Sequence, residues 1–178
     1  MGNYLDTWLD DYVVLDLETT GFSAARDAII DLGAAHIVDG EVVEEFSQLV
    51  NPDRPVSYRI TQLTGISNDM LDGQPLIGDV LPEFLDQLGS NVLLGHNITF
   101  DLGFLNHNAQ LVVGRPLPND YMDTMRLSRK LFPQERTHKL EALIRRFHIA
   151  DTEEHRGLSD AIQTAQCYEY MKHFARSC

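Results

Sequence analysis

The sequence is short of cysteine, of basic residues and of long apolar runs. Its two cysteines, Cys167 and Cys178, are too few for a disulfide framework and fit a reducing compartment. No apolar run approaches the ~20 residues that a membrane-spanning helix needs. The first residues also lack the basic region and apolar stretch of a secretory signal. We therefore expect a cytoplasmic protein with no membrane partner.

Basic residues are outnumbered, with 14 Lys and Arg against 27 Asp and Glu and a formal net charge of −13. This balance argues against a nucleic-acid partner, because such proteins usually carry a basic surface. Residues 126–146 differ from the rest, since they hold seven basic and two acidic side chains. This stretch is either a solvated helical surface or a basic flank that follows a phosphate backbone.

The order of predicted elements indicates one α/β domain over residues 1–178. Asp39-Gly40 is a strong hairpin signal between two predicted strands, 28–38 and 41–50, which follow a buried strand at 12–17. Short strands are expected at 91–94 and 121–124. Helices are expected at 75–88, 98–112, 125–131, 139–147 and 158–174. Strands first, and then strands alternating with helices, predict a mixed central sheet.

Asp16 and Glu18 stand two residues apart at the end of the first predicted strand. Their side chains therefore leave the same face of the sheet. Two neighbouring carboxylates that are partly buried repel each other, so a cation between them is one explanation. A polar strand end with both groups solvated is the other.

Three more candidates lie where helices begin. Asp101 falls in the first turn of a predicted helix, where the helix dipole alone favours an acid. His155 and Asp160 are five residues apart, so they converge only if His155 lies in the loop before the last helix. Each could be an ordinary surface group. Together the four carboxylates and the histidine suit two divalent ions, Mg²⁺ or Mn²⁺, with histidine as a base.

These residues resemble the motifs of the DEDDh-type 3′–5′ exonuclease family, which includes the proofreading epsilon subunit of bacterial DNA polymerase III. Asp16-Leu17-Glu18-Thr19-Thr20-Gly21 is similar to the first motif, His96-Asn97-x-x-Phe100-Asp101 to the second, and His155-x4-Asp160 to the third. Ile60-Thr61-x-Leu63-Thr64-Gly65-Ile66, between the first two, also matches. The resemblance covers about residues 11–174 and implies an RNase H-like fold, a five-stranded mixed sheet flanked by helices.

The resemblance also implies a role for each matched residue. Asp16, Glu18, Asp101 and Asp160 would bind the two divalent metal ions, with Asp16 bridging them. His155 would be the general base for the attacking water. The terminal nucleotide would be held by Thr19, Leu63, Thr64 and Phe100.

Two neighbouring features complete the expected site. Asp123-Thr124 has the pattern of a strand end and a helix N-cap, with support of the site as the alternative. Gly157 stands where the family commonly has alanine, and we expect it to loosen the loop that carries His155.

Three functions fit these observations. The first is hydrolysis of single-stranded DNA from the 3′ end to nucleoside 5′-monophosphates, in proofreading or repair. The second is the same chemistry on RNA or short oligonucleotides. The third is a non-catalytic nucleic-acid-binding adaptor on the same fold. Only four residues follow Phe174, so we expect any association with a DNA polymerase to occur without a C-terminal tether.

Overall fold

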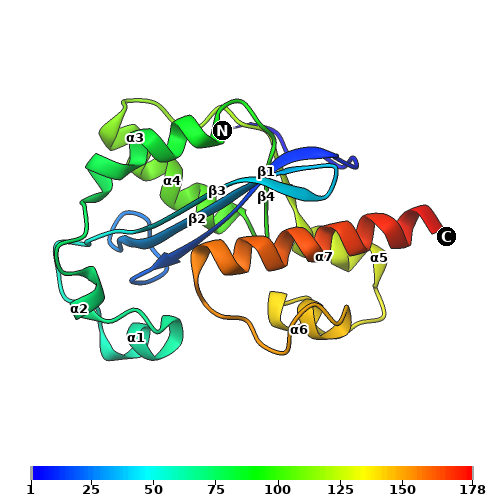
Figure 1. The fold of residues 1–178 in the computed structure, drawn as a ribbon. Helices are drawn as coiled ribbons and strands as arrows, with labels where there is room; N and C mark the ends of the chain where they lie inside the picture. Colours follow the sequence, from blue (N-terminus) through cyan, green and yellow to red (C-terminus); the bar gives the residue numbers. More distant parts are fainter. Residues whose placement is uncertain (1, 178) are drawn as a thin grey trace.

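A five-stranded sheet forms the centre of the computed structural model, which describes residues 2–177; Cys178 lies outside the described residues. The strand order is β3-β2-β1-β4-β5 (Figure 1). The strands are β1 (Asp11–Thr19), β2 (Ile29–Val38), β3 (Glu41–Leu49), β4 (Leu93–Gly95) and β5 (Tyr121–Asp123). β2 pairs antiparallel with both β1 and β3, whereas β4 pairs parallel with both β1 and β5. This confirms the expected mixed sheet.

Helices cover both faces of the sheet (Figure 1). Within residues 2–177 they are α1 (Tyr58–Thr64), α2 (Asn68–Leu71), α3 (Ile77–Leu88), α4 (Thr99–Val112), α5 (Thr124–Leu131), α6 (Leu140–Arg146) and α7 (Gly157–Ser177). One face carries α3 and α4, and the other carries α5, α6 and α7. None of these helices is long and apolar enough to cross a membrane.

Side-chain alternation along β1 determines what each face of the sheet contacts. Leu15 and Leu17 belong to the buried cluster under α3 and α4, whereas Tyr12 and Val14 belong to the cluster under α7. The same period of two continues past Val14. Asp16 and Glu18 are therefore on the α7 side, at the carboxyl end of the strand.

The first turn of α7 lies directly on the sheet because two glycines meet there. A Cβ atom on Gly33 of β2 would overlap the backbone of Gly157 and Leu158. A Cβ on Gly157 would lie only 2.8 Å from the Gly33 amide nitrogen and 3.0 Å from the Asp16 carbonyl oxygen. Gly157 is thus the buried first residue of α7 and not a loosening loop residue, which corrects the expectation from the sequence. The contact fixes the helix next to the end of β1.

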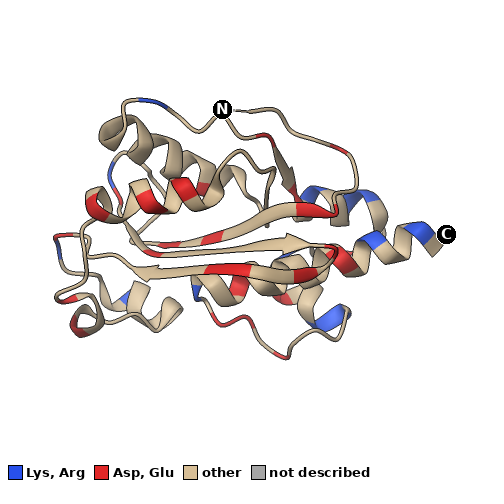
Figure 2. Ribbon diagram, turned by 45° about the horizontal axis from the view of Figure 1, so that its top comes forward, with Lys and Arg blue, Asp and Glu red and all other residues tan. Residues whose placement is uncertain are grey.

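The segment between β3 and α3 forms two short helices where a long surface connection with a helical turn or two was expected. Ser57 and Ser67 accept hydrogen bonds at the starts of α1 and α2. Ile66 and Leu71 are buried beneath them against Ile30 of β2. This places α1 at the end of the sheet where α7 begins (Figures 1 and 2).

Candidate active site

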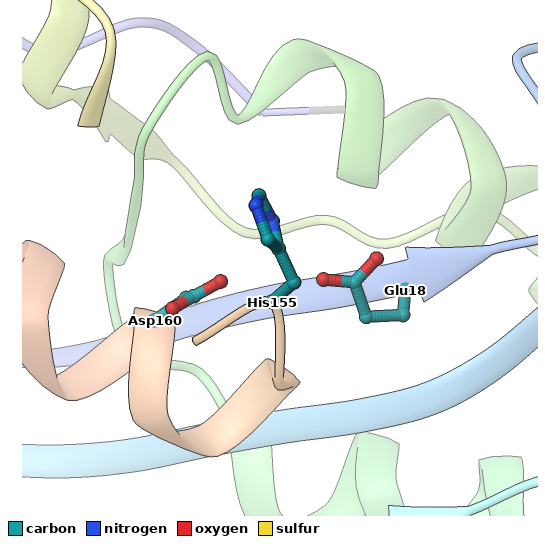
Figure 3. A group of neighbouring side chains, drawn as sticks. All are labelled: Glu18, His155 and Asp160. Carbon is teal, nitrogen blue, oxygen red and sulfur yellow. The ribbon is translucent and has the colours of Figure 1, made fainter. Parts of the chain in front are cut away.

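Acidic side chains from three elements gather at the carboxyl end of β1. One ligand atom each from Glu18, His155 and Asp160 lies within 4.8 Å of the others, a spacing that could hold a metal ion. Figure 3 shows Glu18 on β1 and Asp160 in the first turn of α7, on either side of His155. The structure thus brings together three of the predicted site residues from positions far apart in the sequence.

His155 lies in the loop before α7, as its convergence with Asp160 requires. Its backbone adopts a left-handed conformation with φ of 54°, which non-glycine residues rarely take. Its side chain is 37% exposed, and its Nδ1 lies 3.7 Å from Glu153 Oε1, too far for a hydrogen bond. The imidazole is therefore open to solvent beside the two carboxylates.

Asp101 reaches the same strand from α4. Its Oδ1 accepts a hydrogen bond from the Leu17 amide at 3.2 Å, and Leu17 lies between Asp16 and Glu18 in the sequence. Asp101 lies in the first turn of α4, as the sequence predicts, and it is buried there. The start of α4 is thereby attached to the end of β1.

Burial and mutual repulsion make the charged forms of these carboxylates unfavourable. Burial, together with the charges of Asp101 and Glu18, raises the pKa of Asp16 well above its usual range. Burial is also the main cause that raises the pKa of Glu18 and that of Asp101 to about 8. It raises the pKa of Asp160 to about 6. Asp160 and Asp31 add repulsion to Glu18.

The donor set fits divalent cations. Carboxylate oxygens are the ligands that Mg²⁺ and Mn²⁺ prefer, and a bound cation would offset the repulsion that raises these pKa values. Glu18, His155 and Asp160 offer two oxygens and a nitrogen at the spacing of metal ligands, and the carboxyl groups of Asp16 and Asp101 lie close enough to interact with them electrostatically. The cluster therefore has the composition of a metal centre.

The four residues predicted to hold a terminal nucleotide occupy different environments. Thr19 is buried and its hydroxyl donates to the Gly21 carbonyl at 2.7 Å. Thr64 is also buried; its hydroxyl donates to the Ile60 carbonyl and accepts from the Ile66 amide, which ends α1. Leu63 is 52% exposed and Phe100 half-buried. Of the two α1 residues, Leu63 is therefore the one whose side chain is exposed at the surface.

Sequence reasoning missed an exposed aromatic residue beside the cluster. Phe22 follows the first motif, is 85% exposed, and packs edge-on against Phe100 with ring centroids 6.3 Å apart. Phe100 in turn packs against Phe104 at 5.1 Å. The signal was an aromatic residue directly after a tight turn at a strand end.

Two further carboxylates near the site were also missed. Asp31 is 1% exposed on β2, directly opposite Glu18 of β1 in the strand register. Glu153 lies near His155, and burial raises its pKa. An acid within the apolar run of β2 was the available signal for Asp31.

Asp123 acts as the predicted N-cap and also supports the loop before α4. Its side chain accepts from the Met125 and Arg126 amides at the start of α5. The same carboxylate oxygen accepts from the Asn97 amide at 3.1 Å. Nearby, His96 contacts Thr124 Oγ1 at 2.9 Å, and burial lowers the pKa of His96 to about 4. The capping interpretation is confirmed. Asp123 additionally holds the backbone of Asn97, a residue of the second motif, in place.

The basic stretch 126–146 lies on α5, on α6 and in the loop between them (Figure 2). Several of its side chains have partners. Arg126 lies over the Tyr4 ring at 4.8 Å, and three more form ion pairs at 2.7 to 2.9 Å: Lys130 with Asp6, Arg145 with Glu141, and Arg146 with Glu135. Three of the seven positive charges in this stretch are therefore balanced by acidic partners.

Comparison with known proteins identifies the family. The sequence model of the exonuclease family RNase_T matches residues 13–168. The chain belongs to this exonuclease family. The matched range includes all five residues of the predicted site, from Asp16 to Asp160.

Relatives support the same assignment. The chain is 40% identical over 164 residues to the DNA polymerase III subunit epsilon of Aquifex aeolicus, covering 92% of this chain and 81% of that protein. It is 42% identical over 161 residues to the PolC-type DNA polymerase III of Clostridium perfringens, covering 90% of this chain but only 11% of that protein. The exonuclease-family chain thus spans about a ninth of the PolC-type relatives' length.

Solved structures share the fold. Exonuclease X in complex with 5′ overhanging duplex DNA aligns with a TM-score of 0.71 and 24% identity, covering 93% of this chain and 92% of that one. The RNase H-like architecture expected from the resemblance is therefore confirmed.

The raised carboxyl pKa values predict how stability depends on pH when divalent ions are removed. A carboxyl group whose pKa is higher in the folded than in the unfolded state stabilises the fold fully below its unfolded pKa of ~4. This contribution is lost as the pH rises from the unfolded pKa through the folded pKa. For Glu18 and Asp101 the loss therefore runs from about pH 4 to about pH 8, and for Asp160 it is nearly complete by about pH 6. In excess chelator we expect the melting temperature to fall by several degrees from about pH 5.5 to about pH 8.5.

Calorimetry or fluorescence of thermal unfolding measures this dependence. Mg²⁺ or Mn²⁺ should restore the melting temperature at the higher pH, and Glu18→Gln should flatten the pH dependence in chelator. A chelated wild-type protein that is equally stable at both pH values would contradict the electrostatic description of the site.

Proposed function

We propose that the protein is a 3′–5′ exonuclease that hydrolyses the terminal phosphodiester of single-stranded DNA. The observation that carries this proposal is the gathering of Glu18, His155 and Asp160 within 4.8 Å, beside Asp16 and Asp101 at the end of β1. Acids and a histidine in one open cluster suit the transfer of a phosphoryl group to water. The epsilon subunit relative supports a role on DNA ends, in proofreading or repair.

In the proposed reaction four carboxylates hold two divalent ions, Mg²⁺ or Mn²⁺. The residues that would hold the ions are Asp16, Glu18, Asp101 and Asp160. Divalent ions held by these residues would supply activation of the attacking water and stabilisation of charge on the leaving oxygen. The carboxylates come from β1, α4 and α7, so the relative positions of these three elements determine the spacing of the site.

His155 takes a proton from the attacking water. Histidine exchanges protons near neutral pH, and this one is exposed enough to contact solvent while lying beside Glu18 and Asp160. The water oxygen bonds to phosphorus as the bond from phosphorus to the 3′ oxygen breaks. The products are a nucleoside 5′-monophosphate and a strand with a new 3′ hydroxyl.

Apolar groups around the cluster hold the terminal nucleotide. Leu63 and Phe100 pack against its base and sugar, while Thr19 and Thr64 shape the backbone that approaches it. Phe22 supplies an exposed ring on which a base stacks, supported from behind by Phe100. Stacking is sequence-tolerant, as an exonuclease requires, since each base has an aromatic face.

Digestion of labelled oligonucleotides tests this function. With Mg²⁺ or Mn²⁺ the protein should shorten a 5′-labelled single-stranded DNA stepwise from its 3′ end, and excess chelator should stop it. Asp16→Asn should reduce turnover below detection, whereas His155→Ala should lower kcat by about 10²- to 10⁴-fold, because a positioned base contributes that much.

Matched variants and substrates make the result decisive. Asp79→Asn removes an exposed carboxylate of α3 and should leave the rate unchanged. RNA and dinucleotides should be digested in parallel under the same conditions. If either is degraded faster than DNA, that molecule and not DNA is the preferred substrate. Binding without degradation of any substrate would favour the non-catalytic adaptor.

Replacement of Phe22 tests the stacking contact. Phe22→Ala should raise KM for single-stranded DNA by roughly 5- to 100-fold with little change in kcat, since stacking contributes ~1–3 kcal/mol per base. Phe22→Trp should retain affinity. Phe174→Ala, at the far end of α7 and 37% exposed, is the control. Equal KM values for Phe22→Ala and wild type would rule out the contact.

A further inference from the structure

Asp31 is a buried carboxylate that the proposed metal ligands do not explain. It is the third residue of β2 and faces α7, in register with Glu18 on the neighbouring strand. Only 1% of it is exposed. A buried carboxylate is costly unless it is paired, so its partners indicate what it does.

Both partners of Asp31 directly follow His155 in the sequence. One oxygen, Oδ2, accepts from Arg156 Nε at 3.0 Å and from the Gly157 amide at 3.2 Å. The contact between Asp31 and Arg156 is also an ion pair, in which the arginine side chain is 39% exposed. A single carboxylate on the sheet thus holds two consecutive residues at the junction between the His155 loop and α7.

This contact also completes the start of α7. The Arg156 carbonyl accepts from the Asp160 amide at 2.9 Å, which makes Arg156 the residue that precedes the first helical turn. Helices usually have Ser, Thr, Asp or Asn at this position, whose side chains accept from the exposed amides. An arginine cannot accept. Asp31 supplies the acceptor from β2 instead.

His155 lies between two attachments to the rest of the protein. Before it, the Glu154 amide donates to Asp160 Oδ1 at 3.2 Å. After it, Arg156 and Gly157 are held by Asp31. Residues 151–156 have no helical or strand structure of their own. The left-handed backbone of His155 therefore depends on these attachments.

We propose that Asp31 and Arg156 are positioning residues that hold the His155 imidazole beside Glu18 and Asp160. The proposal rests on the function proposed above, in which His155 accepts the proton of the attacking water. In this account Asp31 and Arg156 contact neither the attacking water nor the phosphate. Their effect on the reaction passes through the orientation of His155.

A set of Arg156 variants tests the proposal. Arg156→Ala should lower kcat by about 10- to 100-fold and leave KM within about threefold, because misplacement of a catalytic group costs that much. Arg156→Gln should restore most of the rate, since its Nε2 donor stands at the same point along the side chain as arginine Nε. In a His155→Ala background, Arg156→Ala should cause no further loss of kcat.

Lys172→Met is the matched control. Lys172 is a buried cation at the other end of the same helix and pairs with Asp10 and Glu169 at 2.9 and 2.7 Å. Its removal should lower the melting temperature while leaving kcat unchanged. If Arg156→Ala behaves like this control, or lowers kcat equally with and without His155, the positioning role is wrong.

Hydrogen exchange separates this inference from the proposed function. Peptides that contain residues 151–158 should exchange faster in Arg156→Ala than in wild type, and peptides of β3 should not. Unchanged exchange would overturn the inference even if the wild-type enzyme is active. A wild-type protein that degrades no substrate would instead refute the proposed function, and the catalytic part of the inference with it.

Discussion

Repulsion among partly buried carboxylates is the constraint on which the site depends. Asp16, Glu18, Asp101 and Asp160 come from three elements, and their pKa values are raised because burial and neighbouring charge oppose ionisation. A fold that holds such groups together sacrifices stability near neutral pH. Divalent cations bound there would offset this repulsion, which connects the electrostatics of the site to the chemistry that we propose for it.

Three local features of the sheet hold these carboxylates together. Strand alternation turns Asp16 and Glu18 toward α7, the pair of glycines lets α7 begin against β1 and β2, and the Leu17 amide holds Asp101. The overall charge of −13 argues against tight binding of long polyanions, and three of the seven basic side chains of residues 126–146 are paired with acids. In our account the protein therefore binds DNA mainly through the nucleotide at its 3′ end.

Much of this was predictable from sequence because the signals were local. The apolar run before Asp16, the Asp39-Gly40 turn and the capping Asp123 each determine their own structure within a few residues. The bounds of β4 were predicted less accurately, since the strand runs from Leu93 to Gly95 where 91–94 was expected. A buried strand of three residues is too short to show a periodicity in the sequence. Ordered motifs, recognised together, indicated the site residues that single motifs could not.

The remainder depended on contacts between distant residues. Nothing near Asp31 in the sequence indicates that it holds Arg156, 125 residues away. Gly157 reads locally as a source of looseness, yet it is required by the close approach of Gly33. Likewise, the sequence around Phe22 does not show that its exposed ring packs against Phe100 of α4. Such features are set by packing, which a single sequence does not display.

Proton release during metal binding tests the central claim most directly. If the carboxylates are partly protonated near pH 7 and become ligands, binding of Mn²⁺ must displace protons. Titration calorimetry at about pH 7 in buffers of different ionisation enthalpy should reveal release of about one to two protons. The number released should be smaller at about pH 8.5, and release and binding should both be abolished in Asp16→Asn. Metal binding at pH 7 without any proton release, or no binding at all, would contradict the account.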